Sequence, residues 1–579
     1  MINPPNIRQR SLPGGPHSLP PDLHPVLQRV LLARGVSDSD TLQLGMKHML
    51  TPASLSGIGV AAELLADAVV GDQKILVVGD FDADGATGTA VAILALRAMG
   101  GENISFRVPN RFEFGYGLTV PLVDTLKHNP PDIILTVDSG ISCVAGVARA
   151  QELGCKVIVT DHHLPGKTLP GAEAIVNPNS SGDGFPSKAL AGVGVVFYLA
   201  GALRQTLRNR GWFTNHRPEP NLAQWLDLVA LGTVADLVAL DHNNRVLVAQ
   251  GLERIRRGLC RPGLLALLRV GKRDYRHASA ADLGFAVGPR LNAAGRLEDM
   301  SIGIRCLLSE DRDEADGLAA QLDELNQQRR EMQEQMQVEA LRQVSRSVEA
   351  LNIAGQLPPA VCLFDESWHQ GIVGLVASRV KDAVHRPVVA FAPESQGSGL
   401  LKGSARSVRG LHIRDALALV DARQPGLIKA FGGHAMAAGL SLGHTRLDEF
   451  RAALEQAVIT VLDGAELTVE VLTDGELAPG DINLELAELL QRFGPWGQRF
   501  PEPLFEGRFS VLEHRVVGGA HLRLKVRPQG SASAVEAIAF NHLPEDLPGS
   551  SDVRLVYRLD INRWRGSETC QLMVEHVLP

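Results

Sequence analysis

The sequence predicts an α/β protein whose first domain is a parallel, doubly wound sheet. Between residues 74 and 160, short β-rich runs alternate with helical segments, as they do where crossover helices join parallel strands. Three of these runs end directly in Asp or His, and such sheets place their sites beyond the carboxyl ends of the strands. A long helical segment and a second, shorter alternation follow, so we expect several domains in the 579 residues.

Individual elements follow from the spacing of the apolar residues. In the first part we expect a helical lead-in over residues 1–70, strands at 75–78, 104–108, 133–137 and 156–160, and helices at 87–99, 120–127 and about 144–153. Leu318, Leu322 and Leu325 begin a helical repeat without proline that runs from about 316 to 350. Alternation resumes with a strand at 360–364, a helix at 372–381 and a strand at 387–392, and short strands follow from about 468.

Composition narrows the class of protein. The formal net charge of -8 gives no sign of nucleic acid, but it averages over domains and can hide a local basic patch. The six cysteines show no CxxC spacing, which argues against zinc and against a disulfide framework and fits a reducing cytoplasm. The N-terminus lacks the apolar segment of a signal peptide, and the longest apolar stretch, 189–203, is too short to span a bilayer.

The stretch after the first strand carries the strongest chemical signal. Asp80, Asp82 and Asp84 alternate directly after the apolar run 75–78. Crowded carboxylates repel one another and lose hydration, so they take up protons, pair with cations or hold a metal ion. We favour a metal site; a solvated acidic turn and a helix N-terminus are the alternatives. A calcium EF-hand is disfavoured because Val91 stands where a bidentate Glu is needed and a strand precedes the loop.

Other expected strands also end in acids and histidines. Asp138 follows the run 133–137, and Asp161, His162 and His163 follow the run 156–160. Taken separately, Asp138 could be a helix cap, and the two histidines could be a surface pair. Taken together, these residues fall along one edge of one sheet, which favours a shared site. Because neighbouring residues that leave a strand point to opposite sides, we expect His162 and His163 to have different roles.

A further acid lies in the apolar run 225–237, which has helical character. Asp is a poor helix former, and a buried Asp needs a partner. We therefore expect Asp236 to be a metal ligand, whereas Asp227 is interpreted as a cap or a surface residue.

Together these segments resemble the four motifs of the DHH phosphoesterase superfamily. The matching segments are DFDADG at 80–85, TVDSGI at 136–141, TDHH at 160–163 and GTVAD at 232–236. Others are similar to RecJ, the family of single-strand-specific DNA exonucleases of bacteria: PNR at 109–111, GYGL at 115–118, LAGVGV at 190–195, GPRLNAAGR at 288–296 and GGHAMAAG at 432–439. The resemblance covers nearly the whole chain beyond about residue 40. It implies a DHH catalytic domain at 71–310, a connecting helix at 311–352, a smaller α/β DHH-associated domain at 353–465 and a C-terminal β-barrel of the OB-fold at 466–579.

The same resemblance implies a two-ion site for Mn²⁺ or Mg²⁺. It assigns six ligands: Asp138 to both ions, Asp80 and Asp82 to one, and Asp84, His162 and Asp236 to the other. It also implies that His163 contacts the scissile phosphate and that Asp161 orients the histidines, so Asp138, His163 and Asp161 are the expected catalytic residues. Oxygen ligands with one imidazole suit these two ions better than a thiolate-preferring metal.

Two segments in the second half favour phosphate binding. WHQGIVG at 368–374 precedes an expected helix, and GSARS at 403–407 follows an expected strand. Free N–H groups at a helix start, with Ser and Arg donors, suit a phosphate. With His434 added, the resemblance implies a DNA-phosphate site, where we assign Ser404 and Arg406 to the terminal 5′ phosphate. Arg111 and Arg296 are our candidates for substrate contacts nearer the metals.

The C-terminal region carries the basic patch that net charge conceals. Between residues 508 and 527, five Lys and Arg residues stand against a lone Glu513. The alternation at 521–527 lines one strand face with Arg523 and Lys525, and such a face with Trp564 or Phe540 for base stacking would bind single strands. A solvated face over core aromatics is the alternative, which we prefer for Phe540. The loop at 494–501 departs from the FGxGNP form frequent in the family.

These inferences converge on a metal-dependent exonuclease that degrades single-stranded DNA from its 5′ end to mononucleotides, in DNA recombination and repair. One rival is a superfamily enzyme for pyrophosphate, cyclic dinucleotides or short RNA, against which the C-terminal domain argues. The other is a non-catalytic DNA-binding or scaffold relative, which would lack ligands. The resemblance further implies a monomer with single-strand-binding protein and a RecQ-type helicase as partners.

Overall fold

The computed structural model describes residues 5–110, 113–350, 357–395, 397–463, 467, 469–548, 551–564 and 566–578. Arg111 and the side chain of Trp564, two of the expected substrate-binding groups, lie outside what is described. The chain forms two compact units. The larger unit combines Gln9–Asn326 with Thr473–Pro579, and the smaller unit combines Met1–Arg8 with Gln327–Leu472.

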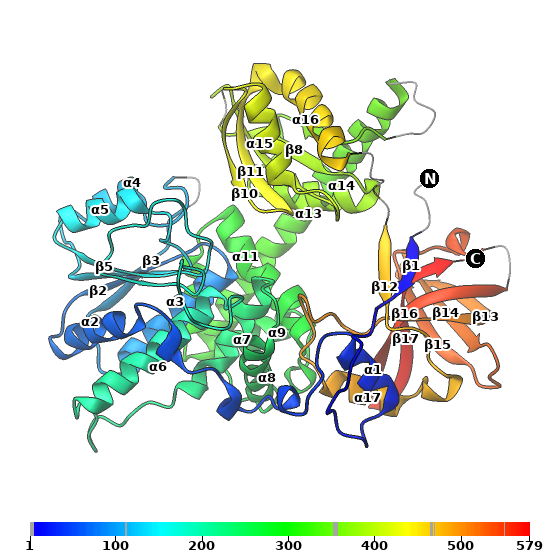
Figure 1. Ribbon diagram of the computed structural model, residues 1–579, viewed down its shortest axis with the longest axis horizontal. Helices are drawn as coiled ribbons and strands as arrows, with labels where there is room; N and C mark the ends of the chain where they lie inside the picture. The colour runs from blue at the N-terminus through cyan, green and yellow to red at the C-terminus, as the bar shows by residue number, and fades with distance from the viewer. Residues whose placement is uncertain are drawn as a thin grey trace. The chain divides into compact units, whose positions relative to one another are not determined.

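A five-stranded sheet is the centre of the larger unit, and its strands run parallel in the order β3-β2-β4-β5-β6. They are β2 (Ile75–Gly79), β3 (Ile104–Arg107), β4 (Ile133–Val137), β5 (Lys156–Thr160) and β6 (Ala174–Val176). Ile75 and Val77 pack with one apolar cluster and Leu76 and Val78 with another, so α2, α3 and α6 cover one face and α4 and α5 the other (Figure 1). The expected doubly wound sheet is confirmed; β6, with three residues, was too short to predict.

Helices flank this sheet and extend beyond it. They are α1 (Pro25–Leu32), α2 (Ile58–Val70), α3 (Ala83–Ala98), α4 (Val120–Asp124), α5 (Val144–Glu152), α6 (Gly192–Asn209), α7 (Leu226–Ala235), α8 (His242–Arg256), α9 (Pro262–Val270), α10 (Ala280–Asp282), a π-helix (Leu283–Val287), α11 (Gly288–Leu297) and α12 (Ser301–Leu308). Short 3₁₀ turns occur at Asp40–Leu42, Met46–His48, Pro52–Ser54, Leu222–Trp225 and Tyr275–His277. The helix expected from residue 87 begins earlier, because the Asp82 carboxylate caps it by accepting from the N–H groups of Asp84 and Gly85 at 2.9 and 3.0 Å.

A closed five-stranded barrel completes the larger unit, as expected. After α17 (Leu484–Arg492) come β13 (Phe505–Val517), β14 (His521–Pro528), β15 (Val535–Phe540), β16 (Asp552–Trp564) and β17 (Ser567–Leu578), with 3₁₀ turns at Pro479–Asp481 and Pro544–Asp546. The expectation that Phe540 belongs to the core is wrong, since its side chain is 44% exposed. Ala537 and Ala539 are the buried residues of β15, so the two-residue period of the strand turns Phe540 outward.

The smaller unit holds a mixed sheet in the order β10-β11-β9-β8-β7. Its elements are α13 (Arg312–Ala350, shared with the larger unit), β7 (Val361–Phe364), α14 (Val373–Val384), β8 (Val388–Pro393), β9 (Leu400–Arg406), α15 (Ile413–Arg423), β10 (Ile428–Gly433), β11 (Ala437–Gly443), a 3₁₀ turn (His444–Arg446) and α16 (Leu447–Leu462). The strand β12 (Glu470–Thr473) pairs with β1 (Asn6–Gln9), so the start of the expected helical lead-in is a strand.

Within the described ranges, no single helix is long and apolar enough to cross a bilayer. One pair of helical segments meets these criteria only when the two are taken together, Met46–Ser54 and Ile58–Val70, and the angle between them is 91°. All six cysteines are free thiols.

Candidate metal centre and phosphate site

Carboxylate and imidazole side chains meet at the carboxyl edge of β2, β4 and β5. Two groups of three residues could each hold a metal ion, because the ligand atoms within each group lie within 4.8 Å of one another. One group is Asp80, Asp82 and Asp138, and the other is Asp84, His162 and Asp236. A third group joins Asp138 to His162 and His163. The structure therefore brings together the acids and histidines that sequence analysis placed at separate strand ends and in an apolar helix.

The start of α6 holds two of these acids in place. Asp84 is buried in the first turn of α3 and accepts hydrogen bonds from the N–H groups of Gly192 and Val193 at 2.7 and 2.8 Å. A Cβ at Gly192 would lie 2.6 Å from the Cβ of Asp138, so only glycine lets α6 approach this closely. Asp138 itself has a φ of 58°, a left-handed conformation that costs a non-glycine residue energy and directs its carboxylate into the cluster.

The donor set fits a divalent ion. Asp138 Oδ1 and His162 Nε2 are buried 3.0 Å apart, yet neither atom has a hydrogen-bond partner among the described residues. His162 Nε2 also lies 3.5 Å from Asp236 Oδ2 and 3.9 Å from Asp84 Oδ2. Buried polar atoms without partners are rare, and an imidazole nitrogen among three carboxylates is a donor set that divalent ions accept.

Burial sets the protonation of the cluster. It raises the pKa of Asp84 to about 7, with the charge of Asp82 as the next cause, and it raises the pKa values of Asp138 and Asp236 well above the ordinary range. Burial and the charge of His163 lower the pKa of His162 to about 4. The imidazole is thus kept in the neutral form that binds metals, while the carboxylates need a positive charge to be ionised together.

Asp161 organises the histidine segment. Its Oδ1 accepts from the backbone N–H groups of His162 and His163 at 2.7 and 3.0 Å and lies 2.8 Å from His163 Nδ1, while Oδ2 accepts from the N–H of Ile141 at 2.9 Å. Burial opposes ionisation of Asp161, but the bonds and charge from His163 outweigh it and lower the pKa of Asp161. Burial likewise lowers the pKa of His163, but the hydrogen bond with Asp161 reverses this and leaves it raised.

The two histidine rings do not point to opposite sides. Their centroids are 4.5 Å apart, because β5 ends at Thr160 and strand alternation stops before His162. That geometric expectation is wrong. The partners of the rings still differ, since His162 faces the carboxylates of the cluster whereas His163 pairs with Asp161.

Tyr116 is a neighbour of this site to which the sequence assigned no role. Its hydroxyl donates to the backbone carbonyl of Asp138 at 3.1 Å and lies 3.4 Å from His163 Nδ1. The ring packs edge-on against Phe81, with centroids 5.9 Å apart. The GYGL segment that contains Tyr116 was the available signal, but nothing in its spacing indicates what the tyrosine contacts.

Helix α11 carries Arg296 to the acidic loop. The Asn292 side-chain oxygen accepts from the N–H of Ala83 at 2.8 Å, and a Cβ at Gly295 would lie 1.7 Å from the carbonyl oxygen of Phe81. Arg296 is the residue after Gly295 and is half-buried. An expected substrate-binding residue therefore lies beside the loop that carries Asp80, Asp82 and Asp84.

The predicted phosphate-binding groups come together in the smaller unit. Gly374 lies in the first turn of α14, and a Cβ there would lie 2.8 Å from Arg406 Nη2 and 2.9 Å from Ser404 Oγ. Arg406 Nη1 also donates to Ser404 Oγ at 3.0 Å. We expected Ser404 and Arg406 to follow a strand, but both lie within β9. The two-residue period of this strand puts both side chains on the same face. His434 is in the β10–β11 turn, where its N–H donates to Ala437 at 2.8 Å.

The basic face of the barrel is partly neutralised. β14 alternates as expected, with Arg523 and Lys525 between buried apolar residues. Arg523 Nε lies 3.0 Å from Glu536 Oε2, and Lys525 Nζ lies 3.6 Å from Glu513 Oε1. Arg527 is exposed and makes no ion pair in the part of the chain that the structure describes.

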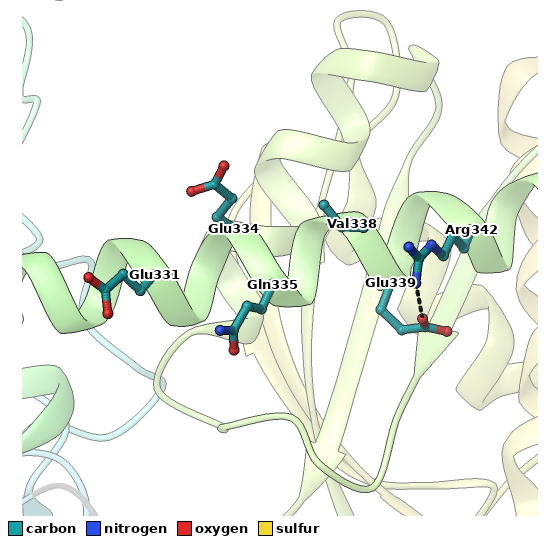
Figure 2. Close-up of a pocket in the computed structure, with 6 residues that line it drawn as sticks. All are labelled: Glu331, Glu334, Gln335, Val338, Glu339 and Arg342. Carbon is teal, nitrogen blue, oxygen red and sulfur yellow. Dashed lines mark ion pairs between the residues drawn. The ribbon is translucent and has the colours of Figure 1, made fainter.

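A hollow of about 450 Å³ lies along α13 (Figure 2). Its lining consists of Glu331, Glu334, Gln335, Val338, Glu339 and Arg342. Three carboxylates repel phosphate, and the single arginine is 3.9 Å from Glu339, so this hollow does not suit a DNA backbone.

Comparison with protein families agrees with this site and fold. Residues 74–233 match the DHH family, N-terminal domain, residues 357–460 match the DHHA1 domain, and residues 473–576 match the RecJ OB domain. The parallel-sheet domain with its cluster of Asp and His residues is thus a DHH domain, and it is followed by a DHHA1 domain and a C-terminal OB domain.

Full-length relatives narrow the class. The chain is 52% identical over 567 residues to the single-stranded-DNA-specific exonuclease RecJ of Salmonella typhimurium, covering 97% of each protein. It matches the crystal structure of RecJ in complex with Mn²⁺ from Thermus thermophilus with a TM-score of 0.79 and 30% identity, over 99% of this chain and 80% of that one. The Mg²⁺ complex from the same organism matches with a TM-score of 0.74 and 28% identity, over 99% and 79%. The chain belongs to the RecJ family.

Proposed function

We propose that this chain is a metal-dependent exonuclease specific for single-stranded DNA, which removes mononucleotides from the 5′ end. The observation that carries the proposal is the pair of ligand groups at the strand edge, which place Asp138 with two acids on one side and His162 with two acids nearby. Its relatives are single-stranded-DNA-specific exonucleases, and two related crystal structures are complexes of RecJ with Mn²⁺ and Mg²⁺.

The residues of the cluster have distinct roles in hydrolysis. Asp138, Asp80 and Asp82 would hold one divalent ion, and Asp84, His162 and Asp236 would hold a second, to which Asp138 would also contribute. When bound, two such ions would supply the positive charge that hydrolysis at phosphorus needs. His163, whose pKa is raised by its hydrogen bond with Asp161, would contact the scissile phosphate.

The cradle in the smaller unit accounts for 5′ polarity. A terminal phosphate carries more charge than an internal diester, so it gains most from a helix N-terminus with an arginine and a hydroxyl. Gly374, Ser404 and Arg406 provide these three features, and His434 lies in the turn between the adjoining strands β10 and β11. Arg296, and Arg111 by sequence, contact phosphates nearer the ions.

The barrel supplies a platform for the remaining strand. Its exposed basic residues on β14 contact the backbone, and Phe540 is the candidate for stacking on unpaired bases, with Trp564 added by sequence alone. We infer from the family alone that the enzyme acts as a monomer in the cytoplasm, with single-strand-binding protein and a RecQ-type helicase, in recombination and repair.

The decisive experiment is digestion of a long single strand labelled at either end, beside its duplex, with Mn²⁺ or Mg²⁺ present. Early loss of the 5′ label from the single strand alone is expected. Cleavage restricted to short oligonucleotides or pyrophosphate would leave the fold standing and refute the substrate, and release of the 3′ label first would refute the polarity.

A further inference from the structure

Four side chains form a continuous stack in the larger unit. Trp496 and Phe500 lie face to face, with ring centroids 5.1 Å apart and an interplanar angle of 10°. The guanidinium carbon of Arg245 lies 4.0 Å from the Phe500 ring centroid, and that of Arg34 lies 5.4 Å from the Trp496 centroid. The stack joins α8 to the loop at 494–501, which departs from the usual family form.

Burial makes the Arg245 end of this stack unusual. Arg245 is 3% exposed, its Nε has no hydrogen-bond partner, and no ion pair joins it to a carboxylate of the described residues. A buried guanidinium without a counter-charge depends on its remaining contacts, and a π-face is one of the few that favour a cation. The Phe500 ring, itself 4% exposed, therefore fixes where the start of α8 lies.

The same loop holds the segment that follows Asp236. The N–H of Leu240 donates to the carbonyl of Gln498 at 2.8 Å, and a Cβ at Gly497 would lie 2.7 Å from Leu240 Cδ1. Leu240 is four residues after Asp236, and the short connection includes Leu237 in a left-handed conformation with a φ of 59°. From the other side, Asn244 donates to the carbonyl of Ala239 at 2.9 Å.

We infer that the loop at 494–501 positions Asp236 and thereby tunes the metal centre, in addition to attaching the barrel. The hydrogen bond to Leu240, the contact at Gly497 and the stack on Arg245 hold the connection between Asp236 and α8 at its α8 end, four residues after Asp236. The loop belongs to the C-terminal segment of the chain. This segment therefore affects the position of Asp236 indirectly, through its contacts with Leu240 and Arg245. The inference rests on the proposed function in one respect, that Asp236 is a ligand.

The test is Mn²⁺ affinity of the full chain without DNA, measured by electron paramagnetic resonance, together with kcat and KM on a short 5′-phosphorylated oligonucleotide. Arg245→Met and Phe500→Leu should each weaken Mn²⁺ binding about tenfold, the range typical of groups that orient a ligand, and lower kcat with little change in KM. Arg245→Lys keeps the charge without the planar stack and should be intermediate, whereas Trp496→Phe keeps the stack and should resemble the wild type. Gly497→Ala provides a second route to the same effect if a stack variant fails to fold.

Arg217→Met is the matched control, because Arg217 stacks on Trp212 at 3.7 Å near Met99, at the end of α3 away from Asp82. It should leave Mn²⁺ affinity and kcat unchanged. If the stack variants and Gly497→Ala bind Mn²⁺ within about twofold of wild type and lose only affinity for long single strands, the loop merely attaches the barrel and the inference is overturned. A wild-type protein that binds Mn²⁺ without digesting DNA would refute the proposed function alone, and one that binds no Mn²⁺ would overturn both.

Discussion

The carboxylate of Asp161 lies 2.8 Å from Nδ1 of His163 and at the same time accepts three backbone N–H groups, from Ile141, His162 and His163. One buried acid therefore fixes both the path of the histidine segment and the orientation of one ring. This links the fold at the end of β5 to the chemistry expected of His163.

Replacing Asp161 separates these two tasks. Asp161→Asn keeps one acceptor oxygen but removes the charge, so the pKa of His163 should fall and kcat should drop about tenfold to a hundredfold, with Mn²⁺ affinity largely retained. Asp161→Ala removes every acceptor and should also lower the melting temperature. Nuclear magnetic resonance of the His163 ring in metal-free protein, with steady-state kinetics, checks both; an unchanged ring pKa in Asp161→Asn would contradict the electrostatic role.

Loss of Asp138 should stop hydrolysis while sparing DNA binding. Among the described residues, Asp138 belongs both to the ligand group with Asp80 and Asp82 and to the group with His162 and His163, so Asp138→Ala should reduce turnover by more than about a hundredfold and prevent binding of a full pair of ions. Single-turnover digestion, Mn²⁺ stoichiometry and fluorescence anisotropy with a labelled strand provide the measurements. Wild-type turnover in this variant would refute the proposed site.

A methyl group at Gly374 should fill the phosphate cradle. Because the added Cβ would lie within 3 Å of Ser404 Oγ and Arg406 Nη2, Gly374→Ala should raise KM for a 5′-phosphorylated strand about tenfold and reduce the preference over a 5′-hydroxyl strand. Gly443→Ala, at the end of β11 with ordinary contacts and a φ of -70°, is the control. Equal KM values for the two end groups in wild type would argue against a terminal-phosphate site.

Asp227 gives a pH dependence of stability. It was interpreted as a cap or surface residue, but the structure buries it completely, with its Oδ2 accepting from the N–H of Arg261 at 2.8 Å. Burial raises the pKa of Asp227 from 3.8 to about 6, so the folded protein binds more protons than the unfolded chain between these values. Its contribution to the free energy of unfolding should therefore be intact below pH 3.8 and fall by about 2–3 kcal/mol as pH rises through 6.

The variant Asp227→Asn should remove this dependence. It keeps a neutral acceptor for Arg261 and should stabilise the protein at pH 8 while changing little near pH 4. Urea unfolding at the two pH values checks the sign, and equal stabilisation at both would show that the charge of Asp227 is not responsible.

The arginines of β14 should differ in their effect on DNA binding. Arg523 is paired with Glu536, whereas Arg527 has no ion pair among the described residues, so Arg527→Gln should weaken single-strand binding more than Arg523→Gln. Loss of one phosphate contact should also reduce the slope of log K against log salt by about 0.7. Titrations at several salt concentrations test this, and equal slopes in both variants would place the DNA elsewhere.

Much of this organisation can be read from local sequence. Apolar runs of strand length with acids at their ends predicted β2, β4 and β5, because a parallel sheet aligns the carboxyl ends of its strands. That rule also predicted that Asp80, Asp138 and His162 would come together, although they are far apart in the chain. The period of two in β14 similarly predicted which of its side chains are buried.

The tertiary structure decided what depends on contacts between distant elements. Asp227 is buried and accepts a hydrogen bond from Arg261, 34 residues further along the chain, so the residues next to it do not encode its environment. The approach of Gly374 to Arg406 likewise arises from elements that meet only after folding. The sequence by itself determined the chemical groups and the sheet edge that gathers them, whereas packing determined which of those groups are desolvated, paired or within reach of one another.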